Sequence, residues 1–93
     1  MASVDPTAIP IRQNGVREEQ MDGELLLYVP EATRAIYLNA SAAVIWALCD
    51  GARSVAEIVS ILAESYPEAG ATIGAEVTAT IDQLASAQVV TLA

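Results

Sequence analysis

In residues 24–29, Glu24 is followed by an apolar run that is too short for a typical helix, and this segment predicts a β-strand with two unlike faces. The members of the two faces alternate as Leu25, Leu27 and Val29 on one, and Leu26 and Tyr28 on the other. One face is expected to meet the core. The other is apolar enough to need partial cover.

Two more strands are expected beside this one. Asp22-Gly23 separates it from the extended segment 16–21, and this pair favours a tight hairpin because both central turn residues need positive φ. Pro30 ends the middle strand, because proline cannot donate to a sheet.

A third strand is expected over residues 34–38, after a turn at 31–33. A meander of three antiparallel strands leaves one side of residues 34–38 unpaired. Such a free edge is a site at which another chain can add as a strand.

The segment 39–51 predicts the central helix. Asn39 can cap its first turn, and Gly51 can adopt the left-handed conformation that ends a helix. Its apolar side chains point in nearly every direction, so the helix needs cover on several sides, with Trp46 and Leu48 largely buried. These side chains are Val44, Ile45, Trp46, Leu48 and Cys49.

Two further helices follow. Ser54 and Glu57 form a capping box, and the second helix stops at Pro67. A loop is expected over residues 68–71, and then a third helix over 72–87, because apolar side chains recur there at helical spacing. Residues 89–92 are expected to return as a short wing strand.

The predicted fold is therefore α+β and winged-helix-like, with a three-stranded antiparallel sheet followed by three helices. Residues 1–15 contain Pro6 and Pro10 without a sustained period, which predicts a flexible or loosely docked arm before a domain over 16–93. Alternation of Ile9 and Ile11 suggests an irregular edge strand within that arm.

The formal net charge of −8 changes the interpretation of a winged-helix pattern. The chain has four Arg and no Lys, so it lacks the cations that bind nucleic acid or anionic membranes. The third helix, which would enter a DNA groove, offers Glu76 and Asp82 but no cation. No apolar run approaches the ~18 residues of a membrane span, and no secretory signal is present, so a cytoplasmic location is expected.

Side chains suited to catalysis are scarce. The chain has no His and a single Cys, Cys49, which lies in the most apolar helix, where a structural thiol is expected. No phosphate-binding loop or calcium loop is present. We therefore expect no enzyme activity, no metal and no cofactor.

Several short motifs together resemble the PqqD-like family of peptide-recognition domains. They are Asp22-Gly23-Glu24, Thr33-Arg34, Leu38-Asn39, Ala43-Val44-Ile45-Trp46, Asp50-Gly51 and Ser54-Val55-Ala56-Glu57-Ile58. The resemblance covers residues 16–92. It implies that the leader segment of a ribosomally made precursor peptide adds as a strand to the third strand, in the groove beside the third helix. It also implies a modifying enzyme as partner, which is a radical-SAM enzyme in pyrroloquinoline quinone (PQQ) synthesis.

The resemblance implies a peptide-binding site on two elements. Its residues are Arg34, Ala35, Ile36, Tyr37 and Leu38 on the strand, and Glu76, Thr80, Gln83 and Ala87 on the helix. Arg34 could pair with an acidic leader residue, although a solvated arginine is the commoner case. The sequence leaves open whether Ala35 and Tyr37, or Ile36, direct their N–H groups outward. It also leaves two alternatives: an acidic winged-helix adaptor in transcription, and a related domain that has lost leader binding and serves as a structural subunit.

Overall fold

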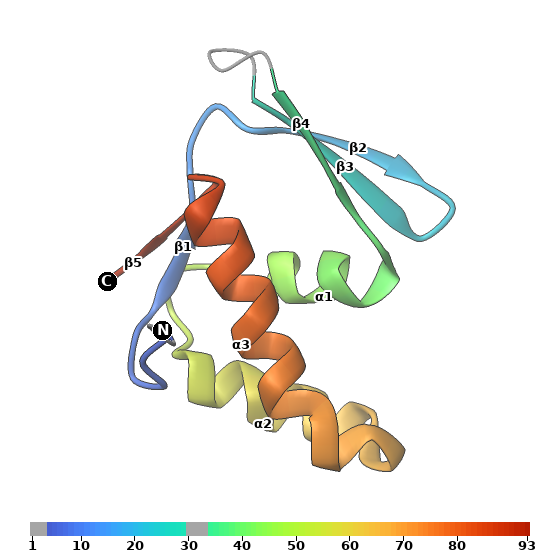
Figure 1. Ribbon diagram of the computed structural model, residues 1–93, viewed down its shortest axis with the longest axis vertical. Coiled ribbons are helices and arrows are strands. Elements are labelled where there is room, and N and C mark those ends of the chain that lie inside the picture. Colours follow the sequence, from blue (N-terminus) through green and yellow to red (C-terminus); the bar gives the residue numbers. More distant parts are fainter. Residues whose placement is uncertain (1–3, 30–33) are drawn as a thin grey trace.

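The computed structural model describes residues 4–29 and 34–93. In these residues a three-stranded antiparallel sheet of order β2-β3-β4 is followed by three α-helices, which confirms the predicted α+β architecture. The strands are β2 (Arg17–Met21), β3 (Glu24–Val29) and β4 (Arg34–Leu38), and the helices are α1 (Ala40–Leu48), α2 (Val55–Ser65) and α3 (Gly70–Ser86). Helix α1 packs between the sheet and α3, and α2 packs against α3 (Figure 1).

The hairpin between β2 and β3 has the predicted turn. Asp22 and Gly23 have φ values of 49° and 83°, and Met21 pairs with Glu24 across the two-residue loop. Positive φ at both positions gives the turn the twist that matches paired strands. The second predicted turn, at Pro30 and residues 31–33, lies outside the described residues.

The predicted start of α1 is present, but the helix ends earlier than predicted, at Leu48 with Cys49 as its C-cap. The Asn39 side chain accepts a hydrogen bond from the Ala42 N–H at 2.9 Å. Gly51 has a φ of 79°, and a Cβ added there would lie 3.3 Å from Cγ1 of Ile11. Glycine is therefore required at this position both for its backbone conformation and for the close approach of β1 (Pro10–Arg12).

Helix α1 is covered on fewer sides than its sequence predicts. Ile45 and Trp46 are each only 2% exposed, as expected for Trp46, but Leu48 is only partly buried and Val44 is 37% exposed. A helix of nine residues between a sheet and one other helix leaves a strip of its surface open. Leu48 packs against the core, but it is less enclosed than Trp46.

The second helix has the capping residues that the sequence predicts, and the third helix begins earlier than predicted. Ser54 and Glu57 form the predicted capping box, with the Ser54 N–H donating to Glu57 Oε1 at 2.8 Å. The expected loop over residues 68–71 is wrong, because a 3-10 helix, η2 (Pro67–Ala69), leads directly into α3 at Gly70. Pro67 opens that turn with a backbone angle already suited to a helix.

The N-terminal segment is docked more closely than an arm. From Val4, which is 8% exposed, the chain runs along the body, where the Val55 N–H donates to the Ala8 carbonyl at 2.9 Å. Strand β1 pairs antiparallel with β5 (Val90–Leu92), so the predicted wing strand joins the N-terminal segment and not the larger sheet. In the described residues, no helix is long and apolar enough to cross a membrane.

Candidate functional site

Strand β4 forms one edge of the larger sheet, with β3 on its inner side. The turn type determines which backbone groups face the free side. In a two-residue hairpin the closing pair, here Met21 and Glu24, is a hydrogen-bonded pair. Along an antiparallel ladder, hydrogen-bonded and non-hydrogen-bonded pairs then alternate.

On β3, Glu24 directs its backbone groups toward β2, and the direction then alternates. Leu25, Leu27 and Val29 therefore direct their backbone groups toward β4. Their β4 partners are Leu38, Ile36 and Arg34. The two remaining residues of β4, Ala35 and Tyr37, therefore direct their N–H and C=O groups to the free side.

The β4 side chains point alternately to the two faces of the sheet. Leu38 is 4% exposed and belongs to the core, and Ile36 is partly buried on the same face. Tyr37 is 54% exposed on the other face. A hydrogen bond with the Glu24 carboxylate, with some desolvation, raises the pKa of Tyr37 above its ordinary value of 10.0. Tyr37 thus remains a neutral hydrogen-bond donor at physiological pH.

The four predicted residues on α3 form one longitudinal face. Glu76 and Gln83 are exposed, and Thr80 and Ala87 are partly buried. At one end of this face the Arg34 guanidinium donates to the carbonyl of Ala87, which joins the start of β4 to the end of α3. This bond occupies part of the guanidinium that the sequence offers to an acidic leader residue.

The other end of the α3 face opens into a hollow of about 420 Å³, which sequence reasoning missed. Its walls come from the start of α1, the end of α2 and the start of α3, and they are mainly apolar, with Glu68 and Glu76 also contributing. Val44 lies in its lining, so the strip that α1 leaves open belongs to this hollow. The sequence did contain a signal for this hollow: α1 has apolar side chains in nearly every direction, but it is too short to be covered on every side.

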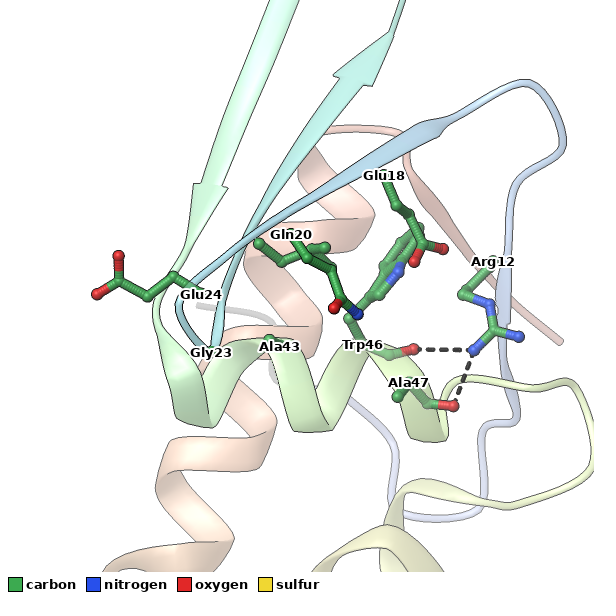
Figure 2. Close-up of a pocket in the computed structure, with 9 residues that line it drawn as sticks. Arg12, Glu18, Gln20, Gly23, Glu24, Ala43, Trp46 and Ala47 are labelled. Atoms are coloured by element: carbon green, nitrogen blue, oxygen red, sulfur yellow. Dashed lines mark hydrogen bonds between the residues drawn. The ribbon is translucent and has the colours of Figure 1, made fainter.

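A second hollow, of about 270 Å³, lies beneath the hairpin and is lined by both polar and apolar residues (Figure 2). There Arg12 Nη1 donates to the carbonyls of Ala47 at 2.8 Å and Trp46 at 3.3 Å. A cation at these carbonyls stabilises the C-terminal end of α1. The indole Nε1 of Trp46 is buried, and none of the residues that the structure describes accepts a hydrogen bond from it. The two Arg12 hydrogen bonds hold β1 to the end of α1.

The single thiol is unsuited to chemistry. Cys49 is fully buried and its Sγ–H donates to the Ile45 carbonyl at 3.2 Å. Burial raises the pKa of Cys49 to about 11, against a smaller opposing effect of Arg12. Among the described residues, no three His, Cys, Asp or Glu side chains gather as metal ligands.

The sequence profile of the family described as "Coenzyme PQQ synthesis protein D (PqqD)" matches residues 24–90. The chain belongs to the PqqD family. Among solved structures, the PqqD-family chain is similar to one titled "TbiB1 in Complex with the TbiA(beta) Leader Peptide", with 20% sequence identity and a TM-score of 0.74. The match covers 86% of this chain and 93% of that one, so the two share a fold. No curated protein matches the sequence significantly.

Proposed function

We propose that this PqqD-family chain is a non-catalytic peptide chaperone. It binds the leader segment of a ribosomal precursor peptide by strand addition at β4, and it presents that peptide to a modifying enzyme of a PQQ-type or related pathway. The observation that carries the proposal is the free edge of β4, where Ala35 and Tyr37 direct their backbone groups outward and Arg34 joins the start of the strand to the end of α3. Family membership and the leader peptide named in the TbiB1 title support it.

Backbone pairing alone would give a weak complex. Ala35 and Tyr37 each offer one N–H and one C=O, and a net gain of about 1 kcal/mol per hydrogen bond gives about 4 kcal/mol in all. That corresponds to a Kd of about 1 mM before the ordering of the leader is counted. Side-chain contacts must therefore provide most of the affinity and the selectivity.

Those contacts lie on the α3 side of the added strand. Alternate leader side chains would point between β4 and α3, where the partly buried Thr80 and Ala87 leave room for apolar groups. Beyond the Leu38 end of the strand, the leader would reach the apolar hollow beside Val44 and Glu76. The carboxylates of Glu68 and Glu76 in this hollow favour a leader that carries Lys or Arg next to its apolar residues.

Proline substitution tests the proposal. Ala35→Pro removes an outward N–H and leaves the pairing with β3 intact, which an edge strand tolerates. The matched control is Glu18→Pro on β2. Glu18 is also the second residue of a five-residue edge strand, and by the same alternation its backbone N–H points to the free edge of the sheet. Ile36→Pro removes an inward N–H and is expected to unfold the sheet edge.

Binding of synthetic leader peptides, taken from precursors encoded beside this chain, is measured by isothermal titration, with circular dichroism as the check on folding. We expect Ala35→Pro to stay folded and to weaken binding at least tenfold, and Glu18→Pro to bind within about twofold of wild type. Normal leader binding by folded Ala35→Pro would refute strand addition at β4. We place the activity in the cytoplasm, where precursor peptides are synthesised.

A further inference from the structure

The outer face of the three-stranded sheet, which points away from the helices, carries an apolar cluster. On the core-facing side of β3, Leu25 and Leu27 are 4% and 0% exposed, so the intervening residues belong to the outer face. The members of this outer cluster are Met21, Leu26, Tyr28, Ala35 and Tyr37. Leu26 lies opposite Tyr37, and Tyr28 lies opposite Ala35, across the β3–β4 ladder.

This arrangement is the reverse of what a solvated sheet face requires. An antiparallel sheet with one face in water normally carries polar side chains on that face. Here Tyr28 is 39% and Met21 38% exposed, and the helices all lie on the other side of the sheet (Figure 1). Tyrosine and methionine are enriched at protein interfaces, and two exposed tyrosines on rigid strands are suited to anchor a partner.

The outer cluster continues into the proposed peptide site. Ala35 and Tyr37 direct their backbone groups to the free edge and their side chains to the outer face. A leader strand added at that edge would place every second side chain on the outer face, next to Ala35 and Tyr37. The bound leader and the outer cluster would then form one continuous surface.

Building on the proposed function, we propose that the outer cluster is the docking surface for the modifying enzyme, which contacts the sheet and the bound leader together. The polar residues on this face are Glu19 and Glu24 against Arg17, and the whole chain carries a net charge of −8. The complementary patch on the enzyme is therefore apolar with a rim of Lys and Arg. A second copy of this chain is a poorer occupant, because it would bring the same negative charge.

The proposal predicts a linkage between the two ligands. An enzyme that contacts domain and leader together binds the leader-loaded domain more tightly than the free domain, and the leader gains affinity by the same factor. We expect a factor of at least fivefold in each direction.

The test uses the double variant Leu26→Thr/Tyr28→Thr, because threonine keeps β-propensity while removing apolar surface. The control is Gln20→Thr, on the opposite face of the same sheet. The probes are the modifying enzyme and the synthetic leader encoded beside this chain, with affinities from interferometry and self-association from light scattering.

We expect the double variant to bind the leader within twofold of wild type and the enzyme at least tenfold more weakly, while Gln20→Thr changes neither. Unchanged enzyme binding by the double variant, or no linkage in a wild type that does bind the leader, would overturn the proposal. A wild-type dimer that the double variant abolishes without affecting enzyme binding would assign the face to a second copy and also overturn it. Failure of the wild type to bind leader would refute the proposed function alone, because the enzyme affinities of the free proteins still decide the role of the outer cluster.

Discussion

Alanine substitutions at two adjacent positions of α1 test whether this helix is buried on one side and open on the other. Ile45 is 2% exposed, so Ile45→Ala removes three buried carbons at about 0.8 kcal/mol each and adds a cavity, within the usual range of about 2–5 kcal/mol. Val44 is 37% exposed and faces the hollow. Val44→Ala removes two partly solvated carbons, worth about 1 kcal/mol, and recovers about 0.5 kcal/mol from the better helix propensity of alanine.

Urea unfolding followed by fluorescence measures both changes, because Trp46 is the single tryptophan and is buried. With an unchanged m value, the shift in midpoint gives the change in free energy of unfolding. The same free-energy changes can be read as shifts of Tm in a thermal melt. In a domain of this size about 1 kcal/mol shifts Tm by about 4–8 °C, so Ile45→Ala should lower Tm by roughly 10 °C or more and Val44→Ala by less than about 4 °C. Partly buried Leu48 should give an intermediate value. Equal costs at Ile45 and Val44 would contradict the one-sided burial of α1 and the open hollow beside it.

Three further predictions follow from charge and local geometry. Burial raises the pKa of Cys49 to about 11 from its ordinary 9.0, so the unfolded chain loses that proton first. The free energy of unfolding should therefore fall as pH rises from 9.0 toward about 11, and urea titrations of Cys49→Ala should lack this part of the pH dependence. Ser54→Ala removes one half of the capping box and should cost about 0.5–2 kcal/mol in the same unfolding assay, whereas a neutral result would show that the cap does not stabilise α2. With a net charge of −8, the chain should not bind duplex DNA at physiological salt, and salt-sensitive micromolar binding in a gel-shift assay would contradict this expectation.

Local signals in the sequence predicted most of the fold because each acts over a few residues. The Asp22-Gly23 pair set the hairpin, the Asn39 side chain capped α1, and Ser54 with Glu57 capped α2. The start of α3 was predicted too late, because a 3-10 turn after Pro67 has only a weak sequence signal.

Long-range pairings could not be predicted in the same way. The β1–β5 ladder joins Pro10 to Leu92, and the Arg12 guanidinium reaches carbonyls of α1 more than 30 residues away. Such contacts depend on how the whole chain packs, and no local pattern specifies them. An arm containing prolines was therefore expected to be loosely attached.

The candidate site was predictable in its elements and not in its detail. The strand 34–38 and the α3 face followed from the pattern and from the family resemblance. The orientation of Ala35 and Tyr37 depends on the β3–β4 register, which the sequence does not give. The hollow at Val44 depends on how far α2 and α3 cover α1, which is a matter of tertiary packing.

Residue-resolved amide hydrogen exchange, with and without the leader peptide, tests strand addition at β4 most directly. In the free chain, the outward N–H groups of Ala35 and Tyr37 should exchange quickly, and that of Ile36, which is paired with β3, should be protected. Saturating leader should slow exchange at Ala35 and Tyr37 by at least tenfold and leave Ile36 protected as before. If leader binds while exchange at Ala35 and Tyr37 is unchanged, the peptide does not pair with this strand and the proposed mode of binding is wrong.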